Sequence, residues 1–136
     1  MLAVCRAAGA RCLLDRGAGM VRELGADGLH LTAAALKETA ARPLPRDFWV
    51  GASCHDRAQL ARAGELDVDF AVVSPVKVTP SHPGAAPIGW SGFESLVETV
   101  NMSVYALGGL MLDDLEDAWA AGGQGIAAIR GLWGAG

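Results

Sequence analysis

The sequence has few cysteine, aromatic and charged residues. Its three cysteines (Cys5, Cys12 and Cys54) are an odd number without Cys-x-x-Cys spacing, which argues against a disulfide framework and a zinc site. Reduced thiols are typical of the cytosol, so we expect a cytoplasmic protein. The chain also lacks an apolar run of about 18 residues, so no membrane-spanning helix is predicted. A signal peptide is only weakly indicated, because no basic segment precedes the first apolar residues.

Basic charge is scarce as well. Eleven Lys and Arg residues stand against 15 Asp and Glu, for a net charge of −4. The cations are scattered and form no basic stripe, so nucleic acid is not expected as a partner. Hydrophobic residues make up 51% of the chain and charged residues 19%. This composition favours one α/β domain over residues 1–136 with a well-buried core.

A strand-then-helix pattern repeats six times along the chain. The predicted strands, each with its polar or glycine-bearing tip, are residues 12–16, 27–32, 48–56, 69–76, 103–110 and 125–133. Runs such as FAVV and GIAAI are continuously apolar, which predicts strands buried on both faces. Repeated βα units predict a parallel sheet with outer helices. The residues leave two closures open, a doubly wound sheet or a (β/α)₈ barrel, of which six units would form only a part.

The ends of the predicted helices carry recognisable residues. A first helical stretch, residues 2–10, has no strand ahead of it. Gly25, Gly64 and Gly122 stand where helix C-termini are expected. Asp113 or Asp114 is expected to cap the helix that follows Leu112.

In either closure, ligands bind at the carboxyl ends of the strands, so polar residues at the strand tips are the candidates for a site. They are Asp15, Arg16, His30, Thr32, Ser53, His55, residues 74–82, Gly108, Gly109 and Arg130. The segment SPVKVTPSHPGAAPIGW (74–90) holds four of the six prolines. Long loops in small domains are functional or disordered, and this one is expected to cover the mouth as a lid or clamp.

Each tip allows two interpretations. Gly108 and Gly109 suit a backbone cradle for phosphate, or a tight turn that needs positive φ. Arg130 suits an anion clamp, or an ordinary surface position. His30 suits acid–base chemistry, because histidine titrates near neutral pH, or a structural hydrogen bond. Asp15 is a candidate Mg²⁺ ligand, although a diphosphate site usually has a second carboxylate.

Six segments in register carry a family resemblance: LLDR, LGADGLHL, VGASCHD, DFAVVSPVKVT, YALGGL and GGQGIAAIRGLW. Across residues 2–133 the chain resembles the thiamine phosphate synthase / TenI family of (β/α)₈ barrels. It most resembles the TenI-like C-terminal domain of some Nudix-type hydrolases, in which SPV-x-x-T-x-SHPGA-x-x-x-GW and GIAAIRGLW are typical.

The resemblance implies an α/β fold, a partial TIM (β/α)₈ barrel of six parallel strands. These would be family strands 3–8, so the chain is expected to be N-terminally truncated and to lack the first two strands. The family synthase joins a hydroxymethylpyrimidine diphosphate to a thiazole phosphate with Mg²⁺ and releases pyrophosphate. Its tautomerase relatives transfer a proton without metal. The resemblance therefore implies thiamine biosynthesis, with a phosphorylated thiazole or pyrimidine bound at the barrel mouth.

The family pattern carries over residue by residue only in part. At the metal end Asp15 matches one ligand, whereas Leu14 and residues 32–35 replace the family's Asn and second acid. More of the family's phosphate-binding positions than of its metal-binding positions have a counterpart in this chain. The resemblance implies a phosphate-binding role for Ser53, Thr79, Gly108, Gly109 and Arg130, where Arg130 stands in place of a serine. His82 replaces a loop lysine, and His30 or His82 is the implied proton carrier.

Two other roles remain open for this chain. One is a catalytically degenerate module, binding or regulatory, derived from a Nudix–TenI fusion. The other is a homo-oligomer, because a sheet edge without its neighbouring strands can pair with another copy.

Overall fold

The computed structural model describes residues 1–132 and contains one sheet of six parallel strands. The strands are β1 (Leu13–Leu14), β2 (Gly28–Leu31), β3 (Trp49–Cys54), β4 (Phe70–Val73), β5 (Ser103–Leu107) and β6 (Gly125–Ala127). Every strand lies inside the run predicted for it, and neighbours in the chain are neighbours in the sheet. The last predicted run extends to Trp133, which lies outside the described residues.

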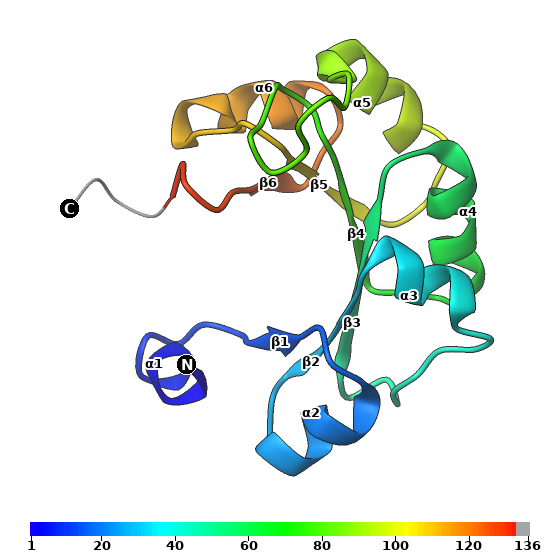
Figure 1. The fold of residues 1–136 in the computed structure, drawn as a ribbon, viewed down its shortest axis with the longest axis vertical. Coiled ribbons are helices and arrows are strands. Elements are labelled where there is room, and N and C mark those ends of the chain that lie inside the picture. Colours follow the sequence, from blue (N-terminus) through cyan, green and yellow to red (C-terminus); the bar gives the residue numbers. More distant parts are fainter. Residues whose placement is uncertain (133–136) are drawn as a thin grey trace.

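Within the described residues, six helices and one 3₁₀ turn accompany the strands; the first helix precedes β1, and the others connect consecutive strands. They are α1 (Leu2–Ala7), α2 (Ala18–Leu24), α3 (Ala33–Glu38), α4 (Arg57–Glu65), α5 (Gly89–Val97), η1 (Leu112–Asp114) and α6 (Leu115–Ala120). Figure 1 shows the sheet curving like half a barrel, with α2 to α6 along its outer side. The predicted partial (β/α)₈ barrel is thus confirmed. No helix within residues 1–132 has the length and apolarity needed to cross a membrane.

The core lies between the sheet and the outer helices. Along β3, Val50, Ala52 and Cys54 face the helices and are fully buried, whereas Trp49 on the opposite face is 45% exposed. Alternation of this kind follows from the two-residue period of a strand. The prediction that GIAAI is buried on both faces is wrong for Ile126 and Ala127, which are only partly buried. The reason is position, because β6 ends the sheet and pairs with β5 alone among the described residues.

The predicted helix ends are mostly correct. Gly25 has a left-handed conformation with φ +69° and ends α2, and Gly122 (φ +86°) follows α6. Gly64 is an error, since it lies within α4; there the positive φ falls on Asp67. Asp114 does bond at the start of its helical segment, because its carboxylate accepts a hydrogen bond from the Met111 N–H at 2.8 Å.

An arginine network joins the amino ends of β3 and β4. The Arg42 guanidinium donates to the carbonyls of Leu44 (2.9 Å) and Phe48 (2.9 Å) and to the Asp69 carboxylate (3.0 Å). Asp69 also accepts from the Val50 N–H at 2.7 Å. This network fixes the end of the sheet opposite to the strand tips that carry the candidate site residues.

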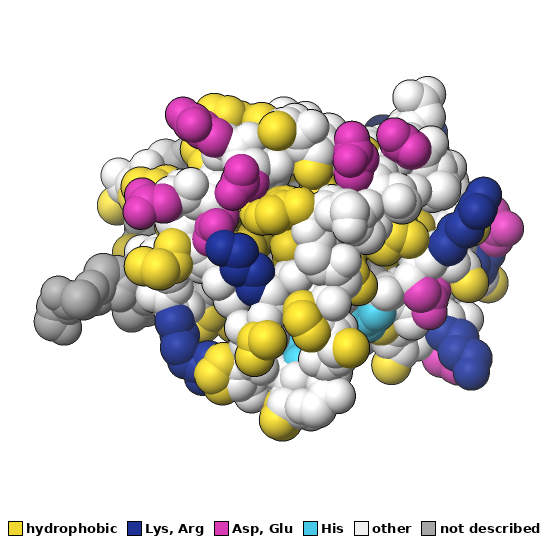
Figure 2. All heavy atoms as spheres, turned by 90° about the horizontal axis from the view of Figure 1, so that it is seen from above, with side chains coloured by type: hydrophobic (Ala, Val, Ile, Leu, Met, Phe, Trp, Pro, Cys, Tyr) yellow, Lys and Arg dark blue, Asp and Glu magenta, His cyan; other side chains and the backbone are white. Residues whose placement is uncertain are grey.

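The outer helices carry acidic side chains. Figure 2 views the molecule from above, on the side where α5 and α6 lie, and shows Asp and Glu side chains spread between apolar ones. Glu94 on α5 and Glu116 and Asp117 on α6 are exposed acidic residues of these two helices.

Candidate functional site

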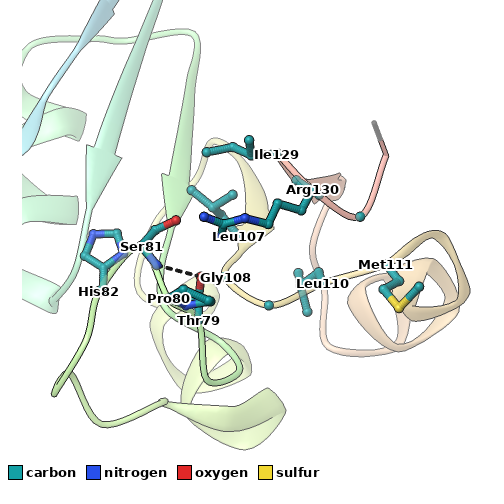
Figure 3. Close-up of a pocket in the computed structure, with 13 residues that line it drawn as sticks. Thr79, Pro80, Ser81, His82, Leu107, Gly108, Leu110, Met111, Ile129 and Arg130 are labelled. Atoms are coloured by element: carbon teal, nitrogen blue, oxygen red, sulfur yellow. Dashed lines mark hydrogen bonds between the residues drawn. The ribbon is translucent and has the colours of Figure 1, made fainter. Parts of the chain in front are cut away.

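A pocket of about 320 Å³ lies at the carboxyl ends of β5 and β6, and we call it the rim pocket. Three segments far apart in the sequence line it: residues 79–82, 107–111 and 128–131. Figure 3 shows these segments facing one another. Five residues singled out from the sequence therefore meet around one cavity: Thr79, His82, Gly108, Gly109 and Arg130.

The loop 74–90 forms one wall of the rim pocket. Its first residues continue the pairing of β4 with β5, because the N–H groups of Val76 and Lys77 donate to the carbonyls of Leu107 (2.9 Å) and Gly108 (3.0 Å). The far end of the loop returns to the same place, where the Ile88 N–H donates to the Pro75 carbonyl at 3.0 Å. Both ends of the loop are thus fixed beside β5.

Gly108 and Gly109 form the turn on which this wall rests. Their φ angles are +112° and +64°, which L side chains rarely adopt. A Cβ on Gly109 would lie 2.3 Å from the Val78 carbonyl oxygen, and one on Gly108 would lie 2.7 Å from Pro75 Cα. The turn interpretation of the two glycines is therefore correct. The same two residues also line the cavity, so the cradle interpretation stays a prediction.

Arg130 is the cationic side chain among the residues that line the rim pocket within the described chain. In Figure 3 it extends across the cavity toward Ser81 and the loop wall. The other lining side chains are largely apolar and include Leu107, Leu110, Met111 and Ile129. An arginine beside an apolar wall suits a ligand with an anionic group at one end and an apolar ring at the other.

His82 joins the rim pocket to a second histidine. Its ring packs edge-to-face against His55, with the ring centroids 5.5 Å apart. The His55 Nδ1 lies 2.9 Å from the Ser74 carbonyl oxygen, so this nitrogen carries the proton. The sequence placed His55 at a strand tip but gave no reason to pair it with His82, because the contact depends on how the loop folds back.

His30 and Ser53 form a separate pair on the concave face of the sheet. His30 Nε2 lies 2.8 Å from Ser53 Oγ, across the adjacent strands β2 and β3. Burial lowers the pKa of His30, and the Asp15 charge opposes this effect. Neither residue lines the rim pocket, so the structure places the predicted phosphate ligand Ser53 and proton carrier His30 apart from Thr79, Gly109 and Arg130.

The residues around Asp15 do not fit a magnesium ion. Its side chain is 68% exposed, and its closest charged neighbour is Arg16, 4.0 Å away. Over residues 1–132, no three His, Cys, Asp or Glu side chains are grouped in a way that could hold a metal. Mg²⁺ prefers an octahedral set of oxygen ligands, of which Asp15 would supply one.

Cys54 is not placed to act as a nucleophile. It is fully buried on the helix-facing side of β3. Burial raises the pKa of its thiol to about 12, so the reactive thiolate is scarce at neutral pH.

A curved parallel sheet with a pocket at the carboxyl ends of its strands places the protein among (β/α)₈-barrel proteins, whose ligand sites lie at this face. The sequence profile of the family described as thiamine monophosphate synthase matches residues 1–132. The chain therefore belongs to this family.

Two curated relatives illustrate the similarity. A thiamine-phosphate synthase of Chromobacterium violaceum is 36% identical over 135 residues, which cover 96% of this chain and 63% of the relative. A putative thiamine-phosphate synthase 2 of Aquifex aeolicus is 36% identical over 104 residues, covering 76% of this chain and 56% of the relative. The chain thus spans somewhat more than half the length of these two relatives.

A solved structure shares the fold. Thiamine phosphate pyrophosphorylase from Pyrococcus furiosus superposes with a TM-score of 0.69 at 24% identity, over 92% of this chain and 59% of that one.

Proposed function

We propose that this chain acts in thiamine biosynthesis and binds a phosphorylated thiazole or pyrimidine in the rim pocket. The observation that carries the proposal is the meeting of Thr79, Gly108, Gly109 and Arg130 around one cavity. The names of its relatives, thiamine-phosphate synthases, support the same assignment.

Within this proposal Arg130 binds the phosphate, and the backbone of Gly108 and Gly109 lies beside it. A guanidinium can donate two parallel hydrogen bonds to a phosphate, which fixes both its position and its orientation. The apolar side chains Leu107 and Ile129 would contact the heterocycle. His82 is the histidine nearest to such a ligand, so it is the stronger of the two proposed proton carriers, and His30 is the other.

Two activities are compatible with this site, a thiamine phosphate synthase-like transfer and a TenI-like tautomerisation. The transfer requires neutralisation of a diphosphate leaving group. The single exposed carboxylate of Asp15 supplies little of the metal site that this step uses in the family. Proton transfer by His82 makes no such demand, so the geometry favours tautomerisation if the chain is active by itself.

The exposed Asp15 also favours the second candidate function, a degenerate phosphate-ligand binding or regulatory module derived from a Nudix–TenI fusion. Such a module would keep the rim pocket and lose the metal end of the site.

One experiment separates these functions. The protein is incubated with hydroxymethylpyrimidine diphosphate, thiazole phosphate and Mg²⁺ and assayed for thiamine phosphate. Binding of thiazole phosphate alone is measured by calorimetry. Thiamine phosphate as product supports the synthase, and binding without product supports the tautomerase or the binding module. An assay for thiazole isomerisation then distinguishes these two.

The matched variants are Arg130→Gln and, as control, Arg22→Gln on the outer helix α2. Loss of a charge-assisted hydrogen bond should weaken thiazole phosphate binding about 10-fold or more in R130Q. R22Q should bind like the unaltered protein. Equal binding by R130Q would contradict the assignment of Arg130, and absence of any binding would contradict the proposed function.

A further inference from the structure

An ion pair joins two of the segments that continue into walls of the rim pocket. Lys77 Nζ lies 2.6 Å from Asp114 Oδ1 and joins the loop 74–90 to η1. Neither residue lines the cavity, but the loop wall begins two residues after Lys77, at Thr79. The wall formed by residues 107–111, which we call the Met111 wall, ends three residues before Asp114.

Asp114 uses both of its carboxylate oxygens. Oδ1 bonds to Lys77, and Oδ2 accepts from the Met111 N–H at 2.8 Å. Its side chain is only 12% exposed. The hydrogen bond from Lys77 lowers the pKa of Asp114, with a further contribution from the Met111 N–H, so the carboxylate stays ionised at neutral pH. One carboxylate therefore holds the Met111 wall and the loop wall together.

Lys77 is itself held at two points. Its N–H donates to the Gly108 carbonyl at 3.0 Å, and its ammonium bonds to Asp114. The carbonyl oxygen of the next residue, Val78, lies only 2.3 Å from the position that a Cβ on Gly109 would take. The position of Thr79 relative to Gly109 thus depends on how Lys77 is held.

We propose that Lys77 and Asp114 are positioning residues of the rim pocket: their ion pair sets the distance between the loop wall and the Met111 wall, and directs the Lys77 ammonium away from a bound anion. Arg130 then remains the cation that meets the ligand. This inference rests on the proposed function of the rim pocket as a phosphate site.

The proposal and direct binding of the anion by Lys77 predict opposite changes in anion affinity when the Asp114 charge is removed. If Lys77 attracted the anion simply by its charge, removal of the Asp114 charge would free it and strengthen binding. If the pair positions the walls, removal of either partner should weaken binding. Because residues in direct contact do not contribute additively, removing both should then cost about as much as removing one.

The test measures the affinity for inorganic phosphate by calorimetry in the unaltered protein, Lys77→Gln, Asp114→Asn and the double variant. We expect a loss of about 3-fold or more in each single variant and no further loss in the double variant. Stronger or unchanged binding by D114N, or losses that add in the double variant, would overturn the proposal.

Two controls distinguish positioning from a general loss of stability. Arg46→Gln removes an exposed ion pair with Asp67, and Val21→Ala loosens the core beneath α2; both lie away from the rim pocket. Both should bind phosphate like the unaltered protein, even though V21A melts at a lower temperature. If V21A lost as much affinity as D114N, the effect would reflect stability and the proposal would fail.

Amide hydrogen exchange without ligand gives a second readout. In D114N, exchange should accelerate at Met111 and in the segment 77–79, and remain unchanged at the amino ends of β3 and β4. If the unaltered protein fails to bind phosphate, the proposed function falls and this inference falls with it. If it binds phosphate and the exchange pattern is unaltered in D114N, only the inference falls.

Discussion

At the scale of single residues, the rim pocket depends on the backbone of Gly109. Substitution of Gly109 by Ala should destabilise the protein by about 1–3 kcal/mol, because the φ angle is +64° and the new Cβ would meet the Val78 carbonyl oxygen at 2.3 Å. Urea unfolding followed by circular dichroism measures this change.

Gly19 offers a matched control for this substitution. It lies within α2, and a Cβ there would meet nothing within 4 Å. Gly19→Ala should therefore stabilise the protein by up to about 1 kcal/mol, as alanine does in helices. Equal effects of the two substitutions would contradict the close approach of the loop to Gly109.

His30 should make stability depend on pH. Its pKa in the folded protein is lowered by burial below the ordinary 6.5, so the unfolded chain binds the proton more readily. The stability that His30 contributes should therefore be fully present above about pH 6.5. It should be lost as the pH falls from about 6.5 toward the lowered pKa.

The measurement is the unfolding free energy between pH 5 and pH 8 for the unaltered protein and His30→Gln. The variant should show a shallower decrease than the unaltered protein, because it lacks the titrating ring at position 30. An identical slope in both proteins would show that His30 titrates normally, against the account of its burial.

Residue types alone could not predict that the candidate site residues form two groups, one at the rim pocket and the other the pair His30 and Ser53. The sequence correctly singled out Gly108, Gly109 and Arg130 as strand-tip residues, and they do meet. It could not show that Ser53 bonds to His30, because that contact depends on the register of β2 against β3. The ion pair between Lys77 and Asp114 could not be predicted either, because the two residues are 37 positions apart in the chain and meet only in the folded protein.

At the scale of elements, the Arg42 network holds the amino ends of β3 and β4 in place. Arg42→Met should destabilise the protein by roughly 2–4 kcal/mol, because it leaves the partly buried Asp69 carboxylate without its cation and removes the donor to several carbonyls. Thermal or urea unfolding measures this loss.

The control for this variant is Arg46→Gln, which removes an ion pair whose side chains are 74% and 56% exposed. Exposed pairs contribute at most about 1 kcal/mol. A loss in R42M as small as that in R46Q would show that the network does not hold the strand ends.

Strands and helices were the part of the structure that could best be predicted. Apolar runs with polar or glycine-bearing tips located the six strands of the described residues, because the strands of a parallel sheet are rich in apolar side chains. The error at Gly64 arose because glycine tolerates both a helical and a left-handed backbone, and here α4 continues through it. The error at β6 arose because burial of a strand depends on neighbours that its own sequence does not specify.

At the scale of the whole molecule, the sheet has two ends. Among the described residues β1 pairs only with β2, and β6 only with β5. Unpaired strand edges can add a strand from another chain. We therefore propose that a second copy pairs at an open edge. Light scattering should then give a mass that rises with concentration above the 14.0 kDa of one chain.

A lysine on the edge strand tests this pairing. Leu13→Lys should lower the measured mass toward that of one chain, because charged side chains on an edge oppose pairing. Leu24→Lys, at an exposed position of α2, is the control and should leave the mass unchanged. A mass of 14.0 kDa for the unaltered protein at every concentration would contradict edge pairing.

The central claim is that the rim pocket holds the phosphate end of the ligand, and NMR titration with thiazole phosphate tests it most directly. The largest amide shifts should occur at Gly108, Gly109 and Gly131, with a shift of the Arg130 side-chain Nε–H. Shifts centred on His30 and Ser53 instead, or no shifts at saturating ligand, would contradict it.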